Sequence, residues 1–171
     1  MVQILTGEGK GKTTAAIGMA VRARGHGLKV CFVTFHKESG GYRSGEFAPL
    51  ANIGVDVYHF ARSHPAFDRD LDRQALREEC LQGLNFVKDV LREAEHPLVV
   101  VDEVLVSVRD GFLTEKEVRG IIDAKPPGVE LVLTGRGASQ KLRQMASLVT
   151  EMKNVKHPFD SGEKEREGIE Y

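Results

Sequence analysis

The chain has 171 residues, which is enough for one domain with a substantial core, and no linker-like stretch divides residues 1–171. Its 24 lysine and arginine residues nearly balance 25 acidic residues, and the net charge of −1 excludes a global basic field for nucleic acid or an anionic membrane. The apolar runs are shorter than a membrane span, and the first residues resemble a strand rather than a signal peptide. We expect one cytoplasmic domain whose partners are small molecules or proteins.

A glycine-rich segment follows the apolar run of residues 2–5 and reads Gly7-Glu8-Gly9-Lys10-Gly11-Lys12-Thr13-Thr14. Such a turn points backbone N–H groups inward, and the helix N-terminus and Lys12 add positive charge, so that the segment can hold polyphosphate. The Thr13 hydroxyl stands where it can ligate the Mg²⁺ that accompanies ATP or GTP. We interpret the segment as a P-loop rather than an ordinary glycine-rich turn, although Thr6 replaces the first glycine of the strict pattern.

A helix is expected over residues 13–24, followed by a strand over residues 29–35 that is apolar on both faces, as in a parallel sheet covered by helices. The polar segment 36–45, which contains Lys37, then follows at the carboxyl end of the strand. Ligands of open α/β sheets bind at such ends, and we interpret this segment as an active-site loop rather than a plain surface loop. Cys31 and Cys80 lack metal-site spacing and are expected to be buried, reduced thiols.

Another strand is expected over residues 55–60, a polar connection over 62–70 and a long amphipathic helix over 71–95. The apolar strand 98–101 then ends in Asp102 and Glu103, the pattern of the metal-side strand in P-loop proteins. A carboxylate at this place holds Mg²⁺ or a water bound to it, whereas the alternative is a pair of solvated loop acids. With the P-loop upstream, we favour a metal site.

A helix is expected over residues 114–124, where Thr114 and Glu117 form a capping box, and a strand over residues 130–133. This strand runs into Thr134-Gly135-Arg136-Gly137, and Arg136 is suited to reach a phosphate or carboxylate, the alternative being a surface arginine. Strands and helices alternate along the chain. This order and the P-loop predict a three-layer α/β fold, P-loop NTPase-like (RecA-like), with a mainly parallel central sheet.

The C-terminal tail has little periodicity but distinctive residues, over 149–162 and in Gly168-Ile169-Glu170-Tyr171. With residues 6–16, 101–103 and 133–137, it makes the chain resemble the P-loop type of ATP:corrinoid adenosyltransferase, the cob(I)alamin and cob(I)yrinic acid a,c-diamide adenosyltransferase family, over nearly its whole length. The loop of that family also lacks the first glycine, so Thr6 agrees with the resemblance.

The resemblance implies transfer of the 5′-deoxyadenosyl group of ATP to the Co(I) of a reduced corrinoid, with release of triphosphate, in adenosylcobalamin biosynthesis or salvage. Because Co(I) attacks C5′ in line as a strong nucleophile, the reaction needs no side-chain nucleophile or general base. It implies ATP and a corrinoid as substrates and Mg²⁺ or Mn²⁺ as the metal. Members of the family are commonly homodimers, and an electron-donor protein for reduction of Co(II) is a further partner that this chemistry allows.

The resemblance also implies roles for individual residues. Charge on the leaving triphosphate is neutralised by the loop amides and Lys12, with Lys10 and Arg136 added to the clamp. The metal is held by Thr13 and by Glu103 or Asp102, of which Glu103 is preferred by its place in the family motif. Lys37 is carried over as a nucleotide or corrinoid contact. The nucleotide-binding set is then Gly7, Glu8, Gly9, Lys10, Gly11, Lys12, Thr13, Thr14 and Lys37.

Two departures from the family concern the corrinoid. Other members carry an N-terminal extension that helps cover the site, whereas this chain starts at Met1, so coverage is expected to differ. They also place a phenylalanine and a tryptophan after the strand that residues 55–60 match, where these expel the lower ligand of cobalt. This chain has no tryptophan, and Phe60 or Phe67 would have to supply the wedge unless the substrate is an incomplete corrinoid. His64 is interpreted as a solvated loop histidine rather than a cobalt ligand.

Two other function classes remain open. A small-molecule kinase or ATPase would share the P-loop and the Asp-Glu strand end and would release ADP. A non-catalytic module that senses ATP or corrinoid would bind both and release no triphosphate.

Overall fold

A computed structural model describes residues 1–37, 45–64, 70–158, 162 and 166–169. In this described part, six parallel strands form one sheet in the order β3-β2-β4-β5-β1-β6. The strands are β1 (Val2–Thr6), β2 (Val30–Phe35), β3 (Asp56–Phe60), β4 (Leu98–Asp102), β5 (Glu130–Thr134) and β6 (Leu148–Glu151). The helices are α1 (Lys12–Gly25), α2 (Phe47–Asn52), α3 (Arg73–Glu93), α4 (Val104–Arg109), α5 (Glu115–Ala124) and α6 (Gln140–Met145). The predicted α/β class with a parallel sheet is confirmed.

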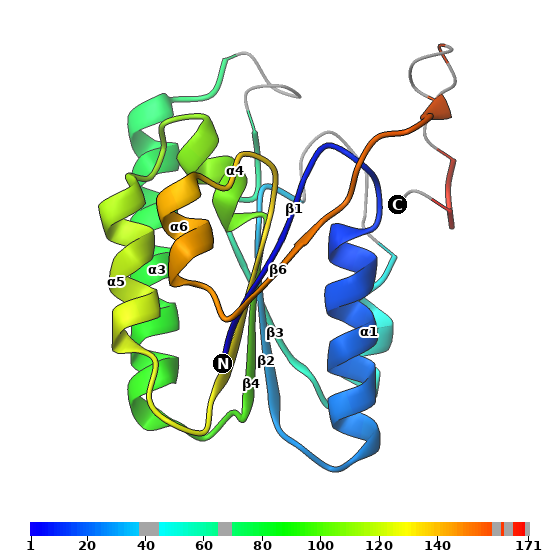
Figure 1. Cartoon of the computed structure of the whole chain (residues 1–171), viewed down its shortest axis with the longest axis vertical. Coiled ribbons are helices and arrows are strands. Elements are labelled where there is room, and N and C mark those ends of the chain that lie inside the picture. The colour runs from blue at the N-terminus through cyan, green and yellow to red at the C-terminus, as the bar shows by residue number, and fades with distance from the viewer. Residues whose placement is uncertain (38–44, 65–69, 159–161, 163–165, 170–171) are drawn as a thin grey trace.

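Helices cover both faces of the sheet and give the three predicted layers (Figure 1). Side chains of β2 alternate between two cores, because successive residues of a strand point to opposite faces. Cys31 and Val33 pack in the core beneath α3 and α5, whereas Val30 and Phe32 pack in the core beneath α1 and α2. Every residue of β2 is buried, which explains why all of them except Thr34 are apolar.

The long helix α3 begins at Arg73, after the Asp72 side chain accepts N-cap bonds from the first turn. Its inward stripe is as its sequence periodicity predicts: Leu76, Cys80, Leu84, Val87 and Leu91 are all buried. The capping box at the start of α5 is also present, because Thr114 and Glu117 exchange hydrogen bonds of 2.6 and 3.2 Å. Both cysteines are buried free thiols, as expected.

Four elements were not anticipated from the sequence: the six-residue helices α2, α4 and α6 and the edge strand β6. Short helices show too few turns for a periodicity. Strand β6 lies in the tail, which has little periodicity in its sequence, and pairs with residues 3–6 of β1. All four of its residues are exposed, so no apolar alternation marks it in the sequence.

In a parallel sheet all strands end at the same edge. The P-loop after β1, Lys37 after β2, Asp102 at the end of β4 and Thr134 at the end of β5 therefore meet there. No helix of the described residues is both long and apolar enough to cross a membrane.

Candidate active site

The P-loop connects β1 to α1 and needs glycine at three of its positions. Gly7 and Gly11 adopt left-handed backbone conformations, with φ of 100° and 113°. A Cβ atom on Gly7 would clash with the Met152 carbonyl, and one on Gly9 would lie 2.6 Å from the carbonyl oxygen of Lys153. The backbone of the tail therefore occupies the space that side chains on this loop would fill.

Two backbone hydrogen bonds attach the tail to the P-loop. The N–H of Met152 donates to the carbonyl oxygen of Thr6 at 2.8 Å, and the N–H of Gly9 donates to the carbonyl oxygen of Met152 at 2.8 Å. These bonds continue the pairing of β6 with β1 past the ends of both strands. The P-loop is thus braced by residues more than a hundred positions away, which no local pattern reveals.

Lys12 lies inside the arc of the P-loop. Its ammonium group donates to the carbonyl oxygens of Gly7 at 2.8 Å and Gly9 at 2.7 Å, and the residue is buried. Burial lowers the pKa of this group, while Glu103 acts in the opposite direction. A cation held inside the loop by backbone carbonyl oxygens, at the N-terminus of α1, is placed where it can bind a polyphosphate.

Thr13, Lys37 and Asp102 form a compact polar cluster beside the loop. The Thr13 hydroxyl lies 3.1 Å from Oδ1 of Asp102, and Nζ of Lys37 lies 2.8 Å from that hydroxyl and 3.0 Å from Oδ2 of Asp102. The Thr134 hydroxyl donates to Oδ1 of Asp102 at 2.6 Å, and the Asp102 side chain is fully buried. The structure thus brings together three residues, Thr13, Lys37 and Asp102, that are expected at the nucleotide and the metal.

Burial disfavours the charge of Lys37, but the carboxylates of Asp102, Glu103 and Glu46 outweigh it and raise the pKa. Glu103 follows the strand in a left-handed conformation with φ 60°, and its N–H donates to the Thr134 hydroxyl at 2.9 Å. Burial, helped by the neighbouring Asp102, raises the pKa of Glu103. The structure places Asp102 against Thr13 and Glu103 beside it, so both carboxylates predicted for the metal lie at this edge of the sheet.

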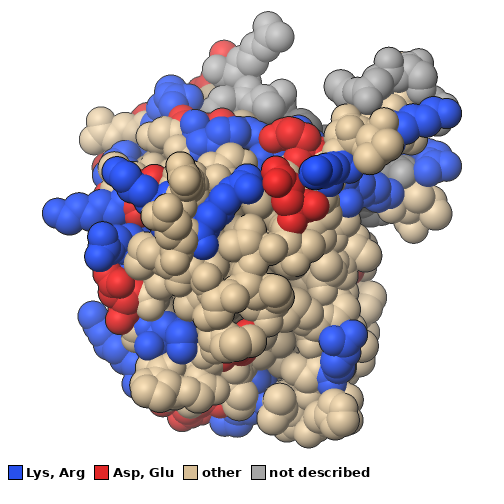
Figure 2. Space-filling model, in the orientation of Figure 1, with Lys and Arg blue, Asp and Glu red and all other residues tan. Residues whose placement is uncertain are grey.

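Lys10 and Arg136 lie on the exposed side of the loop. Nζ of Lys10 donates to the carbonyl oxygen of Ile169 at 3.0 Å, and Nη1 of Arg136 lies 3.0 Å from Oε2 of Glu8. Arg136 is thereby joined to the P-loop, in the neighbourhood that its proposed role requires. Charged side chains gather along the upper edge of the molecule in Figure 2, whereas the middle of that face is largely uncharged.

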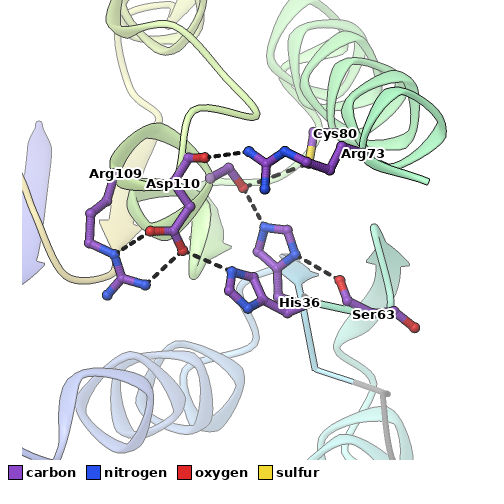
Figure 3. Close-up of polar contacts among 8 residues, drawn as sticks. His36, Ser63, Arg73, Cys80, Arg109 and Asp110 are labelled. Atoms are coloured by element: carbon purple, nitrogen blue, oxygen red, sulfur yellow. Dashed lines mark hydrogen bonds and ion pairs between the residues drawn. The ribbon is translucent and has the colours of Figure 1, made fainter. Parts of the chain in front are cut away.

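A second polar cluster, centred on His36, was not foreseen (Figure 3). Nε2 of His36 lies 2.7 Å from the Ser107 hydroxyl, and its Nδ1 lies 3.0 Å from the carbonyl oxygen of Ser63. The ring of His64 lies edge-on to that of His36, with centroids 5.1 Å apart. The sequence signal was present in a histidine directly before Lys37, but its partners come from distant elements.

The expectation of a solvated His64 is wrong. Its Nε2 lies 2.8 Å from Oδ2 of Asp110, and its side chain is only 13% exposed. Asp110 is also held by Arg109 at 2.7 Å, and the hydrogen bond from Arg109 lowers the pKa of this carboxyl. The error arose because Asp110 is distant in the sequence. Two other expected regions, residues 38–44 of the active-site loop and Phe67, lie outside the described residues.

The family model for ATP:corrinoid adenosyltransferase BtuR/CobO/CobP matches residues 1–171. The chain is 34% identical over 171 residues to the corrinoid adenosyltransferase of Escherichia coli strain K12, a match that covers 100% of this chain and 85% of that protein. It is 35% identical over 171 residues to the corrinoid adenosyltransferase CobA of Salmonella typhimurium, with the same coverage. It is also 34% identical over 166 residues to the enzyme of Pseudomonas aeruginosa, covering 97% of this chain and 81% of the relative. The chain therefore belongs to the ATP:corrinoid adenosyltransferase family of transferases.

Proposed function

We propose that this chain transfers the 5′-deoxyadenosyl group of ATP to the Co(I) of a reduced corrinoid, releasing triphosphate, in adenosylcobalamin biosynthesis or salvage. The observation that carries the proposal is the family match over residues 1–171 together with a P-loop whose Lys12 is enclosed by the loop. We propose further that residues 1–171 act as a single domain.

In this reaction the electron pair of Co(I) forms the cobalt–carbon bond while the bond between C5′ and the triphosphate oxygen breaks. The protein has to align C5′ with cobalt and to stabilise negative charge on the leaving group. The loop amides of residues 7–14 and the ammonium of Lys12 act on the phosphates. Lys10 and Arg136 stand at the rim, where they can add to this clamp. No side chain needs to act as nucleophile or base.

The oxygen donors at the strand ends suit Mg²⁺ or Mn²⁺, which would neutralise phosphate charge. Mg²⁺ usually takes one or two carboxylates and completes its shell with phosphate oxygens and water. Thr13 and one of Glu103 or Asp102 would hold the metal, and we retain Glu103 as the preferred carboxylate because Asp102 is already engaged by Lys37 and Thr134. In the described part of the chain, no group of three or more His, Cys, Asp or Glu is placed so that it could hold a metal ion by itself.

Lys37 is proposed to contact the nucleotide. Its ammonium already lies at the Thr13 hydroxyl, and its raised pKa keeps it charged. A cation at this place can bind a phosphate oxygen when ATP enters.

We also propose a homodimer located in the cytoplasm, with reduced corrinoid supplied through an electron-donor protein. The feature that supports self-association is the edge strand β6, where Leu148 is 46% and Val149 is 36% exposed. An exposed apolar edge strand is a ready surface for a second chain. Sedimentation velocity of the wild type and of a Val149→Lys variant tests this proposal: a monomeric wild type contradicts it.

The activity is tested by mixing the protein anaerobically with ATP, Mg²⁺ and chemically reduced cobalamin or cobinamide. The readouts are the absorbance change on formation of the cobalt–carbon bond and the chemical identity of the phosphate product. Adenosylcorrinoid with triphosphate supports the proposal, and a Lys12→Ala variant is the control that should lose both. ADP without a cobalt–carbon bond would instead indicate a kinase or ATPase, and binding without product would indicate a non-catalytic module. A preference for cobinamide would fit the absence of tryptophan.

A further inference from the structure

His36 occupies an unusual place at the end of β2, directly before Lys37. Its backbone is left-handed, with φ 61°, and the residue is only 8% exposed. A residue with a Cβ atom is strained in this conformation, which persists only where the surrounding structure enforces it.

Three hydrogen bonds hold His36 to two other elements. Its N–H donates to the carbonyl oxygen of Ala61 at 2.9 Å, and its ring contacts Ser63 and Ser107 at 3.0 and 2.7 Å. Because a carbonyl oxygen only accepts, Nδ1 carries the ring hydrogen and Nε2 accepts from the Ser107 hydroxyl. Sγ of Cys80 lies 3.8 Å from Oγ of Ser107 and continues the chain of contacts.

The neutral form of the ring suits this arrangement. Burial lowers the pKa of His36 to about 4, so that the imidazole carries no charge at neutral pH. A neutral ring can donate at one nitrogen and accept at the other, as both of its contacts require.

The ring thereby joins the segments that follow three strands. His36 follows β2, Ser63 follows β3, and Ser107 belongs to α4, which starts directly after Glu103 (Figure 3). The next residue, Lys37, contacts Thr13 and Asp102. The buried histidine and the cation at the phosphate site are therefore consecutive residues.

We propose that His36 is a positioning residue whose buried imidazole fixes the backbone at the end of β2, so that the ammonium of Lys37 is held at Thr13 and Asp102. Its contribution to nucleotide binding passes through Lys37. The inference rests on the proposed function only in that Lys37 faces the Mg²⁺–ATP complex.

Two substitutions separate the side chain from the backbone conformation. His36→Gly accepts a positive φ but removes the ring. His36→Asn also tolerates the left-handed region and keeps an amide that can donate to Ser63, although it is too short to reach Ser107. Ala94→Gly is the matched control, because Ala94 is left-handed with φ 54° at the exposed end of α3.

The experiment is a double-mutant cycle on the dissociation constant of Mg²⁺–ATP, measured by equilibrium dialysis without corrinoid. We expect His36→Gly to raise this constant ~10-fold, equal to about 1.4 kcal/mol, and Lys37→Ala to raise it at least as much. In the Lys37→Ala background, His36→Gly should add less than ~2-fold, since the residue through which it acts is gone. His36→Asn should recover part of the affinity, and Ala94→Gly should bind as the wild type does. Circular dichroism confirms that each variant is folded.

The proposal is overturned if His36→Gly binds Mg²⁺–ATP normally, if its loss is equal in both backgrounds, or if Lys37→Ala alone has no effect. Failure of the proposed activity is distinguishable, because a protein that binds ATP in this pattern but forms no adenosylcorrinoid would keep the positioning role and lose only the assigned reaction.

Discussion

The hydroxyl of Thr13 and the carboxylate of Asp102 lie 3.1 Å apart although 89 positions separate them in the chain. One comes from the start of α1 and the other from the end of β4, and Lys37 bridges both. Each of the five predictions below concerns a group in or next to this arrangement.

Asp102→Asn is expected to reduce stability as well as nucleotide binding. The carboxylate is fully buried and faces Lys37 at 3.0 Å, so an amide would remove the nearer of two carboxylates paired with this largely buried cation and leave Glu46 at 3.6 Å. Breaking one partner of a buried pair costs roughly 3–5 kcal/mol. Urea denaturation measures the change, and a free energy of unfolding within ~1 kcal/mol of wild type would contradict this reading. Asp123→Asn is the surface control, since Asp123 forms an exposed pair with Arg119.

Glu103→Gln tests the preferred metal carboxylate. We expect the Mg²⁺ concentration for half-maximal activity to rise ~10–100-fold, with little change in stability. If Asp102→Asn shows that increase and Glu103→Gln does not, Asp102 is the ligand.

The Mg²⁺ concentration that gives half-maximal activity should vary with pH. Burial raises the pKa of Glu103, and a metal binds only the deprotonated carboxylate. Apparent Mg²⁺ affinity should therefore increase as pH rises through the raised pKa. Titrations of activity with Mg²⁺ at several pH values measure this, and the dependence should weaken in Glu103→Gln. An identical pH dependence in both proteins would exclude Glu103 as its source.

Gly9→Ala is expected to damage the P-loop through the tail. The new Cβ would lie 2.6 Å from the carbonyl oxygen of Lys153, so the loop or the tail must shift, at about 1–3 kcal/mol. Melting temperature and Mg²⁺–ATP affinity should both fall. Gly18→Ala is the matched control: among the described residues, no atom outside the adjoining backbone of α1 lies within 4 Å of its Cβ position, and the change should stabilise by about 0.5–1 kcal/mol. Equal behaviour of the two variants would show that the tail does not constrain Gly9.

His36 should make stability depend on pH. The pKa of His36 in the folded chain is about 4, below its ordinary value of 6.5. Between pH 4 and pH 6.5 the unfolded chain therefore binds a proton at His36 that the folded chain does not bind. This contribution is present above pH 6.5 and is lost as pH falls toward 4, by about 3 kcal/mol. Urea denaturation from pH 7 to 4 should show a smaller decline for His36→Asn than for wild type. If the free energy of unfolding falls by the same amount with pH in both proteins, His36 is not the source of the pH dependence.

Much of the fold was predictable because its signals are local. The apolar strand expected over residues 98–101, the amphipathic helix that corresponds to α3 and the capping box at Thr114 each depend on residues close together in the chain, and all three are confirmed. Elements without such patterns were missed: β6 is exposed along its whole length and α4 has only six residues. The interpretation of His64 failed for a related reason, because its partner Asp110 approaches from another element.

The sequence by itself determined the P-loop, the alternation of strands and helices, and the family, because these depend on residue types at short spacings and on motifs that a family shares. Only the tertiary structure decided which carboxylate touches Thr13, that the tail braces the P-loop, and that a buried histidine stands behind Lys37. The physical reason is that a parallel sheet collects the ends of strands that are far apart in the chain. Contacts among those ends are set by packing and backbone hydrogen bonding, for which a single sequence carries no local signal.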